Sequence, residues 1–384
     1  MRKRPMAGAL AVVVAAVFVG TVVVGGALLT IARQGSATAG HPGAERGRAA
    51  RPIVIGHRGA SAFRPEHTLP SYETAIRMGA DYIEPDLVST KDHVLVARHE
   101  NEISGTTDVA DHPEFAARRT TKTIDGKRIT GWFTEDFTLA ELRTLRARER
   151  LPGLRPGNTA HDGTARVPTL EEVVRLARRH GVGVYPETKH PTYFDSIGLS
   201  LEEPLLKVLG RHGWKDRDDP VFIQSFETGN LRALRKRTRL RLVQLIGGKG
   251  APYDLVAAKD PRMYDHLITR AGLREIASYA DGIGPATSRI FPTGPDGRLL
   301  PATTLVRDAH RYGLVVHAWT VRPENAKLPL EFRRGDPDEP GHRRARGDVA
   351  GWLELLFEAG VDGVFADDPA AARAVRDAFA WRLF

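Results

Sequence analysis

The sequence predicts an α/β protein folded as a (β/α)₈ TIM barrel, with an inserted subdomain after the hairpin of the second strand. Three observations support this prediction. Short apolar runs alternate with helical patterns, which is typical of a parallel sheet covered by helices. One connection between two runs is too short to cross over the sheet. The 384 residues leave room for a barrel of about 250 residues together with insertions.

Nine apolar runs follow one another along the chain as expected strands. Parallel neighbours need a connection of about a dozen residues, whereas only 89–93 separate the second and third runs. The third run therefore returns as the second arm of a hairpin, which leaves the eight strands of a barrel. The same hairpin should fold His99 back beside Glu84. The runs are Ile53–Gly56, Tyr82–Val88, Val94–Ala97, Val182–Pro186, Val221–Ser225, Leu240–Ile246, Gly282–Pro285, Leu314–Thr320 and Gly363–Ala366.

Helical patterns lie between these runs. Thr169 and Glu172 predict a capping box at the start of the third helix. The segment from about 105 to 167 is polar and rich in turns, and we expect it to be a subdomain that caps the barrel mouth. A second, highly charged insertion at 327–348 is interpreted as a solvated loop. The expected helices are Leu69–Met78, Leu139–Ala147, Leu170–His180, Gly229–Arg237 and Val349–Ala359.

The net charge of +9 is concentrated at the N-terminus. Residues 1–51 carry seven Lys and Arg against one acid, whereas the remainder carries 49 against 46. A nucleic-acid groove should place its positive charge in the folded domain, so we expect no nucleic-acid partner. The chain has no cysteine, which excludes disulfides and thiolate metal sites.

The first residues have the pattern of an export signal. Arg2, Lys3 and Arg4 precede an uncharged, mostly apolar run over 7–31. A small-residue cleavage site at 37–39 favours a cleaved signal peptide, but the run is also long enough for an uncleaved membrane anchor. Either interpretation places the rest of the protein outside the cytoplasm. We therefore divide the chain into a leader (1–39), a linker (40–51) and a barrel (52–384).

Carboxylates follow two of the expected strands. Glu84 and Asp86 are two residues apart, so their side chains face the same way. Glu187 ends the next core strand, and the ends of barrel strands form the mouth. The three acids would repel unless neutralised, and an all-oxygen set indicates one divalent cation, Ca²⁺ or Mg²⁺ instead of zinc. Ca²⁺ is favoured, although the sequence does not decide between the two ions. The alternative is that they form ordinary ion pairs with Lys189 and Arg58.

Two histidines and two cations should surround the same mouth. His57 and His99 follow strand-like runs, and histidine can accept or donate a proton near neutral pH. Arg58 is suited to a bidentate phosphate contact, and Lys189 can add a point charge. Trp319 ends a later strand as a possible wall of the substrate pocket. For each residue a structural role is the alternative: buried histidines, an Arg58–Glu84 ion pair, or packing of Trp319.

These residues together resemble the glycerophosphodiester phosphodiesterase family, over roughly residues 52–370 and with an insertion of the secreted, bacterial kind. The resemblance implies a TIM barrel, a Ca²⁺ or Mg²⁺ ion, and hydrolysis of glycerophosphodiesters to an alcohol and glycerol 3-phosphate through a cyclic phosphate. The matching motifs are His57-Arg58-Gly59, Pro65-Glu66-His67-Thr68, Glu84-Pro85-Asp86, Lys91-Asp92, His99, Glu187-Thr188-Lys189, Gln224-Ser225-Phe226, Trp319-Thr320 and Asp362-Gly363.

The resemblance also assigns roles. His57 and His99 become the general base and the general acid, whereas Arg58 and Lys189 become the phosphate contacts. The acids Glu84, Asp86 and Glu187 become the metal ligands. Two positions depart from the family pattern, because His67 replaces a more usual Asn and Glu100 replaces a common Asp. These departures concern fine specificity.

Two other functions are compatible with parts of this pattern. A barrel phospholipase of the sphingomyelinase D or phosphoinositide-specific type would need an apolar rim, and the polar insertion argues against one. A non-catalytic surface protein that binds phosphate would have lost a histidine or a ligand, and every one is present. The sequence does not distinguish among glycerophosphodiesters or a teichoic acid polymer, and it does not determine the oligomeric state.

Overall fold

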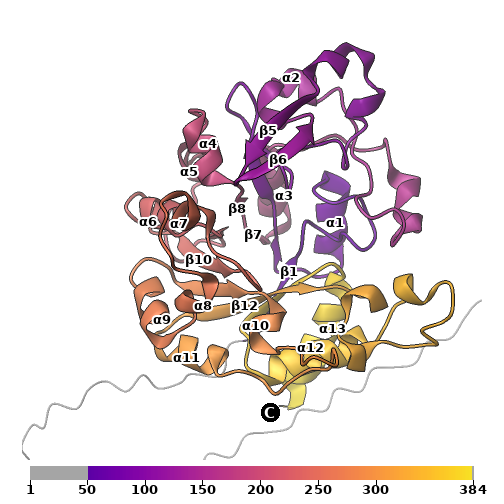
Figure 1. The fold of residues 1–384 in the computed structure, drawn as a ribbon, viewed down its shortest axis with the longest axis vertical. Coiled ribbons are helices and arrows are strands. Elements are labelled where there is room, and N and C mark those ends of the chain that lie inside the picture. The colour runs from indigo at the N-terminus through magenta and orange to yellow at the C-terminus, as the bar shows by residue number, and fades with distance from the viewer. Residues whose placement is uncertain (1–50, 383–384) are drawn as a thin grey trace, which may run out of the picture. The chain divides into compact units, whose positions relative to one another are not determined.

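A curled sheet of 11 strands forms the centre of the structure, a computed structural model that describes residues 51–382 (Figure 1). Parallel pairings connect successive strands, and the last strand, β13, pairs with the first, β1. This confirms the predicted α/β class and strand order. The strands are β1 (Ile53–Gly56), β2 (Tyr82–Ile83), β3 (Asp86–Ser89), β4 (Leu95–Ala97), β7 (Gly183–Val184), β8 (Glu187–Thr188), β9 (Phe222–Ser225), β10 (Arg241–Ile246), β11 (Gly282–Pro285), β12 (Val315–Val321) and β13 (Gly363–Ala366).

Two predicted strands differ from the structure. The run Tyr82–Val88 is divided into β2 and β3, whereas the run Val182–Pro186 forms β7 only as far as Val184, and β8 begins beyond the predicted end of the run, at Glu187. Each interruption contains a proline, Pro85 or Pro186, which has no N–H group for a ladder hydrogen bond. The strand therefore changes partners at the break: β2 pairs with β1 and β7, whereas β3 pairs with β8.

The predicted hairpin is confirmed. Strand β4 runs antiparallel to β3, with Leu87 opposite Ala97 and Ser89 opposite Leu95. The hairpin brings the chain back along β3 toward the break in the sheet, and His99 follows two residues after β4 ends.

Helices lie between the strands, and four of the five expected helices agree with the structure to within two residues at each end. The capping box of α3 is confirmed, because Thr169 and Glu172 bond each other's backbone. The helices are α1 (Leu69–Arg77), α2 (Leu139–Leu142), α3 (Leu170–His180), α4 (Pro191–Ser196), α5 (Glu202–Arg211), α6 (Thr228–Arg235), α7 (Tyr253–Ala257), α8 (Tyr264–Leu267), α9 (Arg270–Ile276), α10 (Thr287–Ile290), α11 (Leu305–Arg311), α12 (Val349–Glu358) and α13 (Pro369–Arg382).

The expected helix Leu139–Ala147 is wrong in its second half. Helix α2 ends at Leu142, and the following backbone takes part in tertiary contacts instead. Ala147 forms a bridge with Thr107, and the backbone N–H of Arg146 donates to Asp108 Oδ1 at 2.7 Å. These bonds to a distant segment replace the hydrogen bonds that a longer helix would make.

Residues 105–167 have secondary structure of their own. A two-stranded antiparallel sheet, β5 (Thr120–Ile124) and β6 (Lys127–Gly131), lies with α2 at the top of Figure 1, whereas α12 and α13 lie at the bottom. Buried side chains of this segment, Phe115 and Phe137 among them, belong to the main hydrophobic core. Its 3₁₀ helices are η1 (Val109–Asp111), η2 (Pro113–Arg118), η3 (Thr134–Asp136) and η4 (Pro156–His161).

A small second core cluster joins strands around the sheet, and it consists of Ile55, Tyr185, Phe222, Val243 and Phe365. Within residues 51–382, no helix combines the length and the apolar character that crossing a bilayer requires. The expected leader (1–39) and all of the linker (40–51) except Arg51 lie outside the described residues.

Candidate active site

Three carboxylates lie together where the sheet is interrupted. Glu84 directly follows β2, and Asp86 and Glu187 begin the neighbouring strands β3 and β8, where they are partners in register. One oxygen from each side chain lies within 4.8 Å of the other two. The structure therefore brings together the three acids that the sequence singled out.

Neighbouring groups hold these carboxylates in place. Gln224 Nε2 donates to Glu84 Oε1 at 2.8 Å, and the backbone N–H of Arg58 donates to Glu84 Oε2 at 3.0 Å. His67 Nε2 donates to Asp86 Oδ2 at 3.0 Å. The second oxygen of Asp86, Oδ1, is buried without a hydrogen-bond partner among the described residues. An unpaired buried carboxylate oxygen is costly unless a cation approaches it.

The electrostatics of the cluster indicate a shortage of positive charge. Burial, and then repulsion from Asp86 and Glu187, raises the pKa of Glu84 well above its usual range. Burial likewise raises the pKa of Glu187 to about 7. Burial alone would also raise the pKa of Asp86, but the combined effects of His67, Lys189 and His99 hold the pKa of this carboxyl well below its usual range. The three groups would all be ionised near neutral pH only with an added cation.

The residues therefore fit a divalent metal ion. Glu84, Asp86 and Glu187 offer oxygen ligands alone, which suits Ca²⁺ or Mg²⁺ better than zinc. The groups that bond Glu84 and Asp86 resemble the outer hydrogen bonds that orient ligands in metal sites.

His57 borders the cluster on the side of Glu84. Its Nδ1 lies 2.5 Å from Asp367 Oδ1, and its Nε2 lies 3.9 Å from Glu84 Oε2. An ionised Asp367 can only accept a hydrogen bond, so Nδ1 carries the proton and Nε2 presents its lone pair, with Thr320 Oγ1 3.5 Å away as a possible donor. Burial lowers the pKa of His57 from 6.5 to about 4, which keeps the ring neutral at pH 7.

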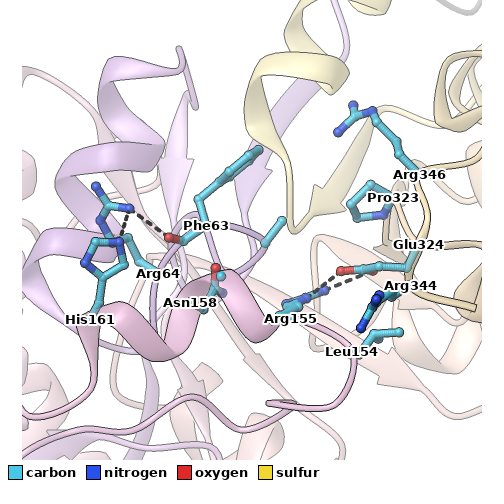
Figure 2. A pocket seen from close by; sticks show the side chains of 12 residues that line it. Phe63, Arg64, Leu154, Arg155, Asn158, His161, Pro323, Glu324, Arg344 and Arg346 are labelled. Carbon is cyan, nitrogen blue, oxygen red and sulfur yellow. Dashed lines mark hydrogen bonds and ion pairs between the residues drawn. The ribbon is translucent and has the colours of Figure 1, made fainter. Parts of the chain in front are cut away.

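A salt-bridge network fixes Asp367 from behind. Arg155 NH2 bonds Asp367 Oδ2 at 2.5 Å, and Arg155 Nε bonds Glu324 Oε1 at 2.6 Å. Figure 2 shows Arg155 and its two bonds to Glu324 at the edge of a neighbouring pocket. Arg322 Nε also lies 3.3 Å from Asp367 Oδ2. Arg155 belongs to the segment 105–167, so this segment helps to orient His57.

His99 borders the cluster on the side of Glu187. Its Nδ1 bonds Glu100, and its Nε2 lies 3.2 Å from Lys189 Nζ. Burial, and then the positive charges of Arg58 and Lys189, holds the pKa of His99 well below 6.5. The ring is therefore neutral at pH 7 in the free protein, and Nε2 accepts from the ammonium of Lys189.

Two buried cations complete the site. Lys189 Nζ bonds Glu187 Oε1 at 2.9 Å. The guanidinium of Arg58 bonds Glu66 at 2.9 Å and lies 3.5 Å from Asp86 Oδ2. The ion pair of Arg58 with Glu84 that the sequence left open is not formed, because only the backbone of Arg58 contacts Glu84. Burying two cations among acids provides positive charge that a phosphate could also use.

A single cavity of about 70 Å³ gathers most of the predicted residues. Trp319 and Phe226 form an aromatic wall, with ring centroids 5.6 Å apart at 85°. The indole N–H of Trp319 donates to the Gly284 carbonyl at 2.7 Å, which fixes the ring. The predicted residues in the lining are His57, Arg58, Glu84, Asp86, His99, Glu187 and Trp319.

The model of the glycerophosphoryl diester phosphodiesterase family matches residues 57–371. The chain belongs to this family. It is 35% identical over 331 residues to a glycerophosphodiester phosphodiesterase of Arabidopsis thaliana, covering 83% of this chain and 84% of that one. A glycerophosphodiester phosphodiesterase of Haemophilus influenzae is 31% identical over 348 residues, covering 83% and 87%.

The fold has a counterpart among solved structures. A phosphodiesterase of Oleispira antarctica, solved with the product sn-glycerol 3-phosphate, matches with a TM-score of 0.54 and 20% identity, over 85% of this chain and 97% of that one. Membership in the family and the names of the relatives show the activity: the chain is an enzyme that hydrolyses glycerophosphodiesters.

Several residues of the site were not predicted as members. Asp367 and Arg322 follow strands β13 and β12, so the rule that strand ends form the mouth could have found them. Gln224 was noticed only within a family motif. Arg150 bonds Glu66 and Glu100 from inside the insertion, and no sequence pattern indicated this.

His67, which departs from the family pattern, is fully buried. Its Nδ1 lies 2.8 Å from Tyr72 Oη and its Nε2 lies 3.0 Å from Asp86 Oδ2. Tyr72 can donate to Nδ1 only if Nε2 carries the ring proton. His67 is therefore a neutral donor that positions Asp86.

Proposed function

We propose that this enzyme releases glycerol 3-phosphate from glycerophosphodiesters with His57 as general base and His99 as general acid. The acids Glu84, Asp86 and Glu187 would hold one divalent cation between the two rings. The observation that carries this proposal is the buried carboxylate cluster, bordered at Glu84 by one imidazole and at Glu187, through Lys189, by the other.

The cation is proposed to be Ca²⁺. Three carboxylates at one position favour Ca²⁺, because Mg²⁺ usually takes one or two carboxylates and retains several waters. When bound, such an ion neutralises the carboxylates and lowers the pKa of a substrate hydroxyl near it.

His57 is arranged to accept a proton. Asp367 holds the tautomer in which Nε2 has a lone pair, and Nε2 faces Glu84. We propose that Nε2 takes the proton of the glycerol 2-hydroxyl as its oxygen attacks phosphorus. Attack forms a cyclic phosphate and breaks the bond from phosphorus to the leaving alcohol oxygen.

Arg58 and Lys189 are proposed to bind the phosphate. Both side chains are buried at the cavity, and the Nε of Arg58 makes no hydrogen bond among the described residues. A phosphate there would replace part of their contacts with Asp86 and Glu187. Preorganised positive charge of this kind stabilises the charge that develops on the phosphoryl oxygens.

His99 is proposed to protonate the leaving alcohol. In the free protein Arg58 and Lys189 disfavour its charged form, so the negative charge of the bound phosphate must offset them before His99 gains a proton. In the second half-reaction the roles reverse. His99 accepts a proton from water, water opens the cyclic phosphate, and His57 returns its proton to the 2-hydroxyl.

Two further features belong to the proposal. The N-terminal leader is proposed to export the enzyme, with cleavage or with retention as a membrane anchor. The segment 105–167 is proposed to be an inserted subdomain of the secreted, bacterial type that caps the mouth. Its support is the contact of Arg155 with Asp367 and of Arg150 with Glu66.

A direct assay tests the proposed chemistry. The purified protein is incubated with glycerophosphocholine, glycerophosphoethanolamine and glycerophosphoglycerol, and released glycerol 3-phosphate is measured. We expect release from at least one diester, loss after chelation and recovery with Ca²⁺. Undiminished release after thorough chelation would refute the metal assignment, whereas phosphocholine as the product would indicate cleavage of the other ester bond.

A further inference from the structure

A second cavity adjoins the catalytic one. It has a volume of about 330 Å³ and shares Glu187 and Phe226 with the catalytic cavity. Lys189, a proposed phosphate contact, also lines it. The volume therefore begins where the phosphate is proposed to bind, on the side of the metal ligand Glu187.

Aromatic rings form one wall of this cavity. Phe226, Tyr253 and Tyr264 line it, and the rings of Phe226 and Tyr264 lie 6.2 Å apart at 71°. Since Phe226 also contacts Trp319, an aromatic row continues from the catalytic cavity into the second one. The turn of the β5–β6 hairpin lies over the wall, because a Cβ added to Gly126 would be 3.7 Å from Tyr253.

A buried carboxylate faces the same space. Glu227 lines the cavity and is 3% exposed. Its Oε2 accepts from the backbone N–H and the hydroxyl of Thr192. Both of these bonds go to the same oxygen, so the carboxyl group is held by one side while it lines the cavity.

The positive groups around the cavity do not neutralise Glu227. Lys189 is paired with Glu187 at 2.9 Å, and His190 Nδ1 lies 2.6 Å from Asp125 Oδ2. Lys127 is exposed. Burial, helped by the charges of Asp254 and Asp125 and opposed by the hydrogen bonds from Thr192, raises the pKa of Glu227 to about 8. A cation bound in the cavity would therefore be needed to hold Glu227 in its carboxylate form near neutral pH.

We propose that this cavity is the subsite for the leaving alcohol, and that it selects alcohols bearing an alkylammonium group. This inference rests on the proposed function and names its substrate class. Aromatic faces with a carboxylate form the environment that binds quaternary ammonium ions, which cannot donate conventional hydrogen bonds. Choline and ethanolamine carry their charge two carbons from the ester oxygen, so it would enter the volume beside Lys189.

The same chemistry disfavours anionic alcohols. A polymer such as a teichoic acid carries a further phosphate on the leaving side, which would lie beside the acidic groups Glu227 and Asp125. The cations Lys189 and His190 are already paired with Glu187 and Asp125, so they offer this second phosphate little attraction. The subsite therefore favours small diesters with a cationic alcohol over polyanionic chains.

The test compares two substrates in the full-length enzyme. For the wild type, kcat/KM for glycerophosphocholine should exceed that for glycerophosphoglycerol by about tenfold, the scale of a cation–aromatic contact. In Glu227→Gln, which retains an acceptor for Thr192, the value for the choline ester should fall about tenfold while that for the glycerol ester stays within about twofold. Glu203→Gln, an exposed acid on α5, is the matched control.

A second readout does not depend on turnover of the cationic substrate. Free choline should inhibit hydrolysis of glycerophosphoglycerol competitively in the wild type, and about tenfold more weakly in Glu227→Gln and in Tyr264→Leu. Equal wild-type kcat/KM for the two esters, or choline inhibition unchanged by both substitutions, would overturn the subsite. No release of glycerol 3-phosphate from any diester would instead refute the proposed function.

Discussion

The two histidines of the site differ in what surrounds them. His57 is buried, and a carboxylate held by Arg155 fixes its Nδ1, so that Nε2 keeps its lone pair beside Glu84, with only the hydroxyl of Thr320 in weak contact at 3.5 Å among the described residues. His99 is partly exposed, and Lys189 occupies its Nε2. The comparison teaches that one ring is prepared to accept a proton before substrate binds, whereas the other gains its proton only once a phosphate neutralises its cationic neighbours.

The largest expected effect comes from removing each ring in turn. His57→Ala and His99→Ala should each lower kcat for a natural diester by about a hundredfold to ten-thousandfold. The p-nitrophenyl ester of glycerol 3-phosphate separates the roles, because its leaving group needs no proton. Release of p-nitrophenol should be largely restored in His99→Ala and remain slow in His57→Ala. Equal restoration of p-nitrophenol release in both variants would contradict the assignment of different roles to His57 and His99.

The next effect concerns the partner of His57. Asp367→Asn should lower kcat by about a hundredfold, because an amide can donate to Nδ1 and so place the ring proton on Nε2. The neighbouring acid provides the control. Asp368 contacts Arg346 and caps α13, and Asp368→Asn should leave kcat within about twofold. Similar losses in the two variants would show that Asp367 acts only through stability.

The pH dependence of kcat/KM tests the environment of His57. The lowered pKa of His57 keeps its base form down to a pH of about 4, so kcat/KM should fall only as the pH drops through that value. Without Asp367, whose charge raises this pKa, the acidic limb should move lower still. A pH–rate profile in chelator-free buffers measures the acidic limb in the parent protein and in the variant without Asp367. An acidic limb near pH 6.5 would contradict the structure around His57.

The smallest expected effect concerns the pH dependence of folding stability, which depends on a buried histidine that has no proposed catalytic role. His317 is remote from the carboxylates, but burial lowers its pKa to about 4 as well. The unfolded chain takes up this proton below pH 6.5 and the folded chain does not, so stability is lost as the pH falls from 6.5 to 4. Denaturant unfolding should show that His317→Gln removes about 3 kcal/mol of this loss.

An exposed histidine provides the reference for that measurement. His180 ends α3 and is exposed, and His180→Gln should leave the pH dependence of unfolding as it is in the parent protein. If His317→Gln also leaves the pH dependence of unfolding unchanged, burial does not lower the pKa of His317.

The sequence was sufficient to predict the side chains that follow barrel strands. His57, Glu84, Asp86 and Glu187 could be predicted because the ends of parallel strands converge on one mouth. The missing N–H of Pro85 already indicated a strand end or a distorted edge, but the break at Pro186 and the change of pairing partner at both prolines were not predicted. An isolated sequence shows the missing N–H of a proline but not the change of partner.

The supporting network of the site could not be predicted in the same way. Asp367 follows a strand and was within reach of that rule, but an acid before Pro369 is equally typical of a helix cap, as Asp368 shows. Arg150 and Arg155 lie in the segment 105–167, where no periodicity of the sequence indicates the position of a side chain. Their contacts with Glu66 and Glu324 exist only because distant segments pack together.

The carboxylate cluster is tested most directly by metal binding itself. Calorimetric titration of the chelator-treated protein should show one Ca²⁺ bound per chain. Binding should be lost in Glu84→Gln and retained in His57→Ala, which removes the base but no ligand. Absence of any binding by the parent protein, or equally tight binding by Glu84→Gln, would contradict a cation held by Glu84, Asp86 and Glu187.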